Sequence, residues 1–287
     1  MKHHFGDFLF REGDYWSIVP NNERFQYLIQ EKIDDKLNIK IATIGKSSDF
    51  WNQIFEFPNL VELTLHEPTK EQTESISKLV NLKRLRITHA RLKDINFINE
   101  LINLEEIVFE YVSGFSDLSP LKNLKKLKSL HFENLRRVSD FDGLKGIDSL
   151  KYLRIDGTFD WKQPIKNFNF LKGLPNLEIL SLGEIITKIE YPVFLPVLNL
   201  KKLKKVNIMR NSFDTKEYAF LEVILPNIDG AKQNLFYKYN DWIEFLGKKA
   251  GMFKENNSLI QEKCEEFESL YESYKIEAER YLKNYFN

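Results

Sequence analysis

The sequence has a single cysteine, Cys264, among 287 residues, and it has no long apolar run. One cysteine cannot form an internal disulfide, which excludes a disulfide-stabilised extracellular scaffold. A membrane-spanning helix needs about 18 or more consecutive apolar residues, and no such stretch is present. The first residues also lack the apolar segment of a signal peptide. These absences predict a soluble, cytoplasmic protein.

Net charge is absent as well, because 42 basic side chains balance 42 acidic ones. A neutral chain has no overall attraction for nucleic acid or for a membrane surface, so neither is expected as a partner. The sequence contains no nucleophile elbow, zinc-protease motif, cysteine pair or glycine-rich phosphate loop. Its five histidines show no metal-ligand spacing. We therefore expect no enzyme activity, no cofactor and no metal.

A repeat organises the chain instead. Segments with the apolar pattern L-x-x-L-x-L recur at steps of 22 to 27 residues. Their first residues are Leu60, Leu82, Leu104, Leu127, Leu150, Leu177 and Leu203. Alternate residues of a strand point to opposite faces, so the leucines fill an interior while the residues between them face solvent. A period of this length predicts a solenoid of stacked turns.

A second signal keeps the same period. Asp94, Asp117 and Asp140 each stand where the chain leaves a turn to begin its return segment, and Asn167 takes that position in the fifth unit. Side chains of this kind cap free backbone N–H groups, which explains their spacing better than a metal site does. The sixth unit has Val193 at this position, beside two prolines, so we expect its return segment to be irregular.

The period and phase of residues 56 to 212 resemble the leucine-rich repeat proteins, and most closely the internalin and phosphatase-regulator type. The chain looks like a solitary bacterial member of that family. This resemblance implies parallel strands on a concave face and irregular or short 3-10 segments on a convex face. One departure is clear, because the asparagine expected after each strand is kept solely at Asn211. Other residues replace it at Pro68, Ala90, Val112, Leu135, Thr158 and Ile185.

Three regions follow from this pattern: an N-terminal cap at 1–47, a solenoid of about seven rungs at 48–215, and a C-terminal helical cap at 216–287. In the first region, residues 7–10 and 15–19 predict a β-hairpin with a four-residue turn, and residues 23–32 predict a helix. Residues 37–41 alternate like a strand and predict an irregular first rung. Residues 217–225 are consistent with either a last irregular rung or a short helix.

A long helix is predicted from Asn257 or Ser258 to about Tyr285. Its apolar stripe alternates in steps of four and three residues. The stripe consists of Ile260, Cys264, Phe267, Tyr271, Tyr274, Ala278, Tyr281 and Tyr285. Two interpretations stay open: the stripe packs on the end of the solenoid as a cap, or it forms a homodimer surface.

An insert after the fifth strand spans residues 157–164 and breaks the repeat. It carries Phe159 and Trp161, and aromatic side chains on such loops often dominate binding interfaces. Two interpretations stay open for Trp161: it is exposed at the rim as a contact residue, or it folds back onto the convex core.

The positions that face out of the predicted sheet form three columns, and the middle of the arc combines basic and acidic residues. Such a surface suits a protein partner of complementary charge and repels phosphate. The residues predicted to bind the partner are Arg84, Arg86, Glu110, His131, Glu133, Tyr152, Arg154, Asp156 and Trp161. The sequence thus favours a non-enzymatic protein-binding scaffold. A short, solitary, bacterial-looking chain without a signal peptide also fits an inhibitor or immunity-type protein. The alternative is an assembly subunit that self-associates through the helix at 260–285.

Overall fold

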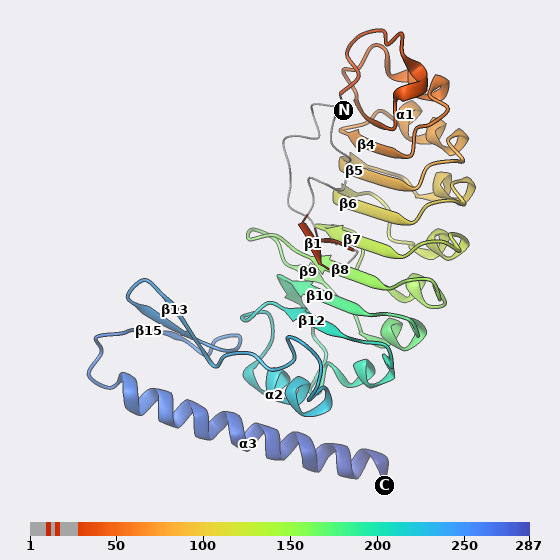
Figure 1. The fold of residues 1–287 in the computed structure, drawn as a ribbon. Helices are drawn as coiled ribbons and strands as arrows, with labels where there is room; N and C mark the ends of the chain where they lie inside the picture. Colours follow the sequence, from red (N-terminus) through yellow and green to blue (C-terminus); the bar gives the residue numbers. More distant parts are fainter. Residues whose placement is uncertain (1–9, 13–14, 18–27) are drawn as a thin grey trace.

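Each repeat of the sequence forms one short strand, and the strands lie side by side along the arc of Figure 1. The structure is a computed structural model that describes residues 10–12, 15–17 and 28–287. Within this part, one parallel sheet has the strand order β12-β10-β8-β7-β6-β5-β4-β3. Its strands are β3 (Ile41–Gly45), β4 (Glu62–His66), β5 (Arg84–Arg91), β6 (Glu106–Ser113), β7 (Ser129–Glu133), β8 (Tyr152–Asp156), β10 (Ile179–Gly183) and β12 (Lys205–Ile208). The predicted α/β solenoid is confirmed.

The register of the sheet follows the predicted columns. Glu62 pairs with Arg84, and Arg84 pairs with Glu106, so equivalent residues of successive repeats are neighbours across strands. The alternate residues, such as Leu63 and Leu85, are buried in one continuous core between the sheet and the return segments. The leucine spacing therefore sets both the face and the register of each strand.

The sheet in the described residues has eight strands, the seven regular rungs and one strand before them. The additional strand is β3, which begins at Ile41, where the predicted irregular rung at 37–41 ends. Residues 36–38 form a short 3-10 helix, η3 (Lys36–Asn38), instead of a strand. The predicted rung is placed too early in the chain, because β3 lacks the L-x-x-L-x-L pattern that locates the other strands. The division of the chain at residues 47 and 215 stays a prediction.

The return segments on the convex face contain 3-10 helices, and the predicted caps are confirmed. The Asn96 N–H donates to Asp94 Oδ1 at 3.0 Å, and the Ser119 N–H donates to Asp117 Oδ1 at 2.8 Å. Asp140 and Asn167 accept equivalent bonds from residues two positions on. The 3-10 helices of the arc are η4 (Trp51–Glu56), η5 (Ile76–Lys78), η6 (Asn96–Glu100), η7 (Ser119–Asn123), η8 (Asp142–Leu144), η9 (Asn169–Gly173) and η10 (Leu195–Asn199). In the sixth unit, the Val193 N–H donates instead to the buried carboxylate of Glu217.

We expect Asp117→Ala to lower the free energy of unfolding by about 1 kcal/mol at pH 7, because the Ser119 N–H loses its acceptor. The backbone hydrogen bond from Ser119 lowers the pKa of Asp117. A carboxyl with a lowered folded-state pKa stabilises the protein above its unfolded pKa and loses that effect as the pH falls through its folded pKa. Urea denaturation of both proteins at pH 7 and near pH 2.5 measures this. An equal difference at the two pH values would contradict the capping role.

Two other kinds of hydrogen bond replace those of the asparagines that the repeats lack. Residues directly after the strands, including Glu67 and Asn134, take positive φ values and donate their N–H groups to the next turn. Glutamines from other segments bond to the remaining groups: the Gln163 side chain accepts from Leu135 N–H at 3.0 Å, and the Gln72 amide donates to the Gly45 carbonyl at 2.7 Å. Gln72 lies on α1 (Lys70–Ser75). The buried backbone groups of these turns are thus paired without a repeated asparagine.

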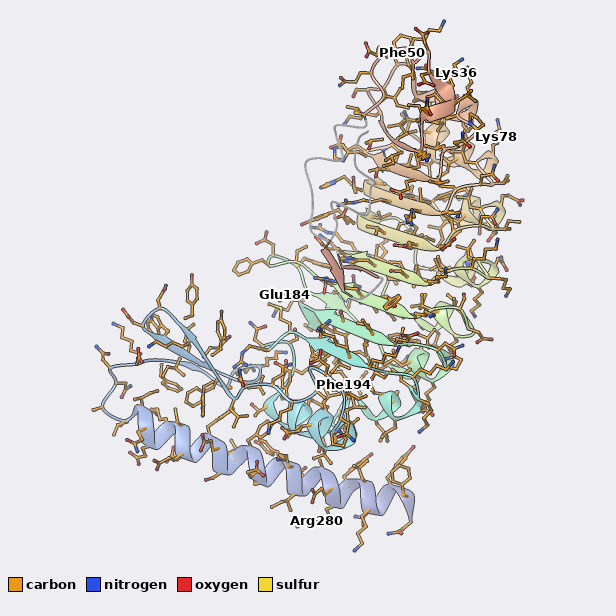
Figure 2. All side chains as sticks on the ribbon, viewed as in Figure 1. Lys36, Phe50, Lys78, Glu184, Phe194 and Arg280 are labelled. Carbon is orange, nitrogen blue, oxygen red and sulfur yellow. The ribbon has the colours of Figure 1, made fainter. Side chains whose placement is uncertain are left out.

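Phenylalanine rings link the turns inside the arc. Ring centroids lie 6.0 Å apart between Phe109 and Phe132, and 6.3 Å apart between Phe132 and Phe141. The series continues through Phe170 and Phe168 to the end of the sheet. Phe194, labelled in Figure 2, belongs to the same series and packs on Phe168 and Phe213.

At the N-terminal end, a hairpin is confirmed, although its bounds differ from those predicted. β1 (Phe10–Glu12) pairs with β2 (Tyr15–Ser17), so Arg11 and Glu12 belong to a strand and not to the turn. The predicted helix at 23–32 falls partly outside the described residues. Its described part is not helical, because Leu28 pairs in parallel with Thr43 and extends the edge of the sheet. The hairpin lies beside β7 on the concave side of the arc (Figure 1).

The C-terminal end begins with α2 (Thr215–Ile224), which resolves the open alternative at 217–225 in favour of a helix. Between the two predicted helical segments, β13 (Phe236–Tyr239), β14 (Trp242–Phe245) and β15 (Met252–Lys254) form an antiparallel sheet that the sequence did not predict. The long helix is confirmed as α3 (Ile260–Phe286), and Asn257 accepts the Leu259 N–H before its first turn. Among the described residues, no helix combines the length and apolar character that crossing a bilayer requires.

The apolar stripe of α3 packs within the chain. Phe267, Tyr271 and Ala278 are buried, and the Tyr271 hydroxyl donates to Glu222 on α2 at 3.0 Å. Phe267 also packs on Phe236 and Phe245 of the antiparallel sheet. Of the two interpretations of this stripe, the structure shows the cap. Arg280, on the opposite face of α3, points away from the protein (Figure 2).

Candidate functional site

The concave face divides into a covered centre and an open C-terminal half. In the centre, Arg86 is 0% exposed, His131 is 1% exposed and Glu110 is 3% exposed. The expectation that these side chains face solvent was therefore wrong. They lie on strands β5 to β7, and the N-terminal hairpin lies beside β7 on this side of the sheet. Tyr152 on β8 is buried as well.

Ion pairs neutralise the covered centre. Arg86 donates from Nε to Glu110 Oε2 at 2.6 Å and from Nη2 to Glu110 Oε1 at 2.7 Å, a bidentate pair. Arg84 bridges Glu62 and Glu106, which flank it on the two neighbouring strands. The paired geometry offsets much of the cost of desolvating these charges, whereas removing one partner would leave the other buried and unpaired.

His131 is a buried titratable ring in the centre of the face. Burial lowers its pKa, which favours the neutral imidazole. Its Nε2 lies 3.6 Å from Asp156 Oδ2, longer than a hydrogen bond. Within the described residues, no group of histidine, cysteine or acidic side chains has the geometry to hold a metal ion.

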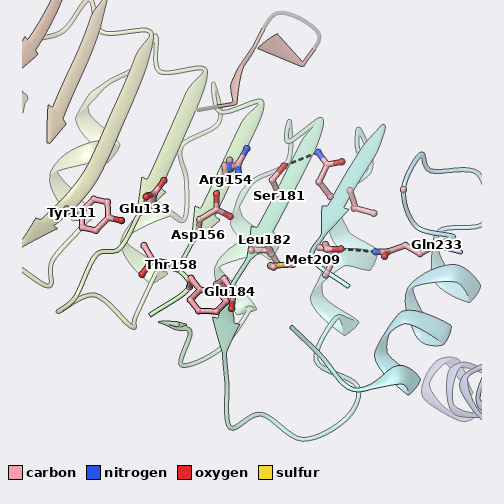
Figure 3. Close-up of a pocket in the computed structure, with 17 residues that line it drawn as sticks. Tyr111, Glu133, Arg154, Asp156, Thr158, Ser181, Leu182, Glu184, Met209 and Gln233 are labelled. Carbon is pink, nitrogen blue, oxygen red and sulfur yellow. Dashed lines mark hydrogen bonds and ion pairs between the residues drawn. The ribbon is translucent and has the colours of Figure 1, made fainter. Parts of the chain in front are cut away.

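A cavity of about 860 Å³ opens at the C-terminal half of the face, beside the ends of β8, β10 and β12. Its polar lining includes Glu133, Arg154 and Asp156, which project from the sheet in Figure 3. The Asn207 amide donates to the Ser181 hydroxyl at 3.0 Å across the floor of the cavity. The Gln233 side chain, which donates to the Ile208 carbonyl, closes the far end (Figure 3).

Apolar side chains line the rim of the cavity. Phe159, on the insert, is 94% exposed, and Tyr111 and Met209 are exposed beside the opening. Trp161 is half-buried, and its backbone closes the loop by exchanging hydrogen bonds with Thr158. Of the two aromatic residues in the insert, Phe159 is therefore the exposed one.

The loop that carries Phe159 is fixed by its backbone. Gly157 begins it, where a Cβ atom would lie 2.4 Å from the Glu184 carbonyl oxygen and 2.6 Å from the Trp161 carbonyl oxygen. After the loop, β9 (Gln163–Pro164) pairs in parallel with β11 (Ile185–Ile186). The insert is thus attached to the next turn and presents Phe159 from a defined position.

The charges in the cavity are not fully balanced. Arg154 donates from Nε to Asp156, which neutralises that carboxylate. Glu133 has no such partner among the described residues, and its pKa is raised to about 7, mainly by burial and then by the nearby Glu110 and Asp156. Its carboxyl group is therefore partly protonated at neutral pH.

From β4 to β12, every turn pairs its strand in parallel with the next, and 3-10 segments return on the other face. The leucines and phenylalanines of the repeats fill the space between these two layers. The fold is a leucine-rich repeat solenoid. This geometry bears out the resemblance that the period of the sequence indicated.

Neither a protein-family model nor a curated protein matches the sequence. Among solved structures, the solenoid is similar to an internalin from Listeria monocytogenes (20% identity, TM-score 0.47), over 65% of this chain and 52% of that one. Internalin C2 of the same species is 24% identical, with a TM-score of 0.41, over 60% of this chain and 69% of its own. A leucine-rich repeat protein of Leptospira interrogans is 16% identical, with a TM-score of 0.38, over 68% of this chain and 62% of its own. The solenoid spans about half of the first internalin.

Three of the nine residues predicted to bind a partner line the cavity of the solenoid: Glu133, Arg154 and Asp156. Arg84, Arg86, Glu110, His131 and Tyr152 lie outside it, and Trp161 stands in the loop beside it. The prediction did not select Ser181, Asn207 and Met209, although the columns contained them, because it concentrated on the middle of the arc. It also missed Tyr111. This residue directly follows Glu110, one of the predicted binding residues, and its backbone has φ 54°.

Proposed function

We propose that this protein is a non-enzymatic scaffold that binds a protein partner in the C-terminal half of its concave face. The observation that carries the proposal is the cavity of about 860 Å³ between the ends of β8, β10 and β12. Phe159 stands at its rim with 94% of its surface exposed. An aromatic residue held out from a rigid scaffold beside a polar cavity is typical of a binding hot spot.

The chemistry of the cavity supports a protein partner over nucleic acid. Glu133, Asp156 and Glu184 line it, against one arginine, Arg154. Carboxylates at the contact surface repel phosphate, whereas mixed charge with apolar rim residues suits a protein surface.

The same lining supports binding over catalysis. The Ser181 hydroxyl accepts a hydrogen bond from the Asn207 amide, and no histidine lines the cavity in the described part of the chain. Ser181 therefore has no histidine beside it in the described lining to accept its proton, which is the usual activation of a serine nucleophile.

The proposal has a finer form, in which the partner is an enzyme or toxin that the scaffold inhibits in the cytoplasm. The scarcity of cysteine supports an intracellular location, because a reducing compartment gives no use to disulfides. Assaying the purified partner with and without an equimolar amount of scaffold tests the inhibitory role.

We expect Phe159→Ala to weaken partner affinity by about 10- to 30-fold, because it removes an aromatic anchor without touching the core. A photoreactive phenylalanine analogue at position 159 would first trap the partner in extracts of the native cell, for identification by mass spectrometry. Calorimetry with the purified partner then measures the affinity.

The matched control is Phe286→Ala, which truncates another exposed phenylalanine at the end of α3. It should leave the affinity unchanged. Equal affinities for wild type, Phe159→Ala and Phe286→Ala would contradict the proposal.

Self-association through α3 would compete with contacts that this helix makes inside the chain. Phe267 and Tyr271, in the stripe that would mediate it, are buried against the antiparallel sheet and α2. A dimer through this stripe would have to break that packing first.

A further inference from the structure

Three carboxylates stand side by side on the concave face. Glu110 pairs in register with Glu133, and Glu133 pairs with Asp156, on the adjacent strands β6, β7 and β8. Neighbouring strands lie about 4.8 Å apart, so three like charges at this spacing repel one another unless cations intervene.

Arginines neutralise the two outer carboxylates. Glu110 holds Arg86 in a bidentate pair, and Asp156 accepts from Arg154. In the described part of the chain, the middle carboxylate, Glu133, forms neither an ion pair nor a side-chain hydrogen bond. It also lines the cavity, so the side chain without a cation is the one that a ligand can reach.

We infer that the protein partner inserts an arginine side chain into this cavity and pairs it with Glu133. The inference rests on the proposed function and names the chemistry of the group that the cavity receives. A guanidinium fits because its planar fork matches a carboxylate with two parallel hydrogen bonds, as Arg86 already does with Glu110.

Tyr111 adds a second reason for a guanidinium. It lines the same cavity, is 42% exposed, and stacks on His89 with a centroid distance of 4.9 Å. The stacking holds the ring in place, and a guanidinium beside an aromatic ring gains a cation–π contact. An ammonium has neither the fork nor the flat face that this pair of residues recognises.

Binding of the arginine is coupled to protonation. The groups that act on Glu133 are Glu110, Asp156, Arg154 and Arg86, and with burial they leave its pKa at about 7. A guanidinium favours the ionised carboxylate and lowers that pKa. Affinity therefore rises as the pH increases through 7, by about tenfold between pH 6 and pH 8.

The direct test uses N-acetyl-argininamide as the probe and carboxyl-labelled glutamate for NMR titration of the full chain. The Glu133 resonance is assigned by its loss in Glu133→Gln. We expect the probe to lower the pKa of Glu133 by about 1 to 3 units and to leave Glu105, which lies outside the cavity and pairs with Lys128 at 2.9 Å, unaffected. The neutral citrulline analogue should have no effect, and N-acetyl-lysinamide a smaller one. An unchanged pKa, or equal effects of the arginine and citrulline probes, would overturn the inference.

Measurements with the partner separate this inference from the proposed function. Glu133→Gln should weaken the partner about tenfold at pH 8 and abolish the rise in affinity with pH, while Glu105→Gln does neither. If Phe159→Ala weakens binding but Glu133→Gln does not, the arginine inference fails and the proposed function stands. If neither variant weakens binding, the proposed function fails as well.

Discussion

Replacing Arg86 by alanine should lower the free energy of unfolding by about 3–5 kcal/mol. Arg86 is 0% exposed and forms both hydrogen bonds of its pair with Glu110, which is itself 3% exposed. Removing the guanidinium leaves a carboxylate in a place from which water is excluded. The cost is mainly the desolvation of an unpaired charge, and urea denaturation at neutral pH measures it.

Two variants control this experiment. Lys128→Ala removes an exposed cation that lies 2.9 Å from Glu105, and it should cost at most about 1 kcal/mol. The double variant Arg86→Met with Glu110→Leu removes both charges and should be close to wild type, because apolar residues of similar volume replace a buried pair without a large loss. A cost for Arg86→Ala no larger than that for Lys128→Ala would contradict the buried pair.

Replacing Phe168 by alanine should also cost about 3–5 kcal/mol, since it opens a cavity where four phenylalanines meet. The ring lies 6.1 Å from Phe170, 5.8 Å from Phe194 and 6.2 Å from Phe213, measured between centroids. Phe213 lies just before α2, so Phe168 connects the last turns to the C-terminal segment. Denaturant titration gives the loss of stability.

We also predict where in the solenoid Phe168→Ala lowers stability. Because each turn of a solenoid packs on its neighbours, the damage should begin at the C-terminal turns, and hydrogen exchange there should accelerate before it does at β4 and β5. Phe159→Ala is the matched control and should change stability by less than about 0.5 kcal/mol, because its ring is exposed. Equal losses for Phe159→Ala and Phe168→Ala would contradict the packing described.

Local repetition made most of the arc predictable. The spacing of the leucines from Leu60 to Leu203 fixes which residues point inward, and the observed register pairs Glu62 with Arg84 and Arg84 with Glu106 as the columns require. Asp94, Asp117 and Asp140 act over two residues, so their capping bonds could be predicted from spacing alone.

Features that depend on distant segments could not be predicted. The burial of Arg86, Glu110 and His131 depends on whether other segments cover the concave face. The strand pattern indicates which face of the sheet a side chain points to, and it does not indicate whether that face is covered. The antiparallel sheet of β13, β14 and β15 lies outside the repeat and has no period to reveal it.

The candidate site shows the same division. Glu133, Arg154 and Asp156 were predicted because they stand in the columns. The cavity beside them also needs the insert with Phe159 and the Gln233 side chain from beyond α2, and no periodic signal connects those segments. Among the described residues, Glu133 is the one of the three adjacent carboxylates that lacks an ion pair. This difference depends on side-chain geometry, which the order of residues does not specify.

The central claim is that a protein partner occupies the C-terminal half of the concave face. Hydrogen exchange of the full chain, with and without the partner trapped at position 159, tests it most directly. The account predicts slower exchange at the ends of β8, β10 and β12 and in residues 157–162, with β3 and β4 unchanged. Protection confined to β3 and β4, or to α3, would contradict it.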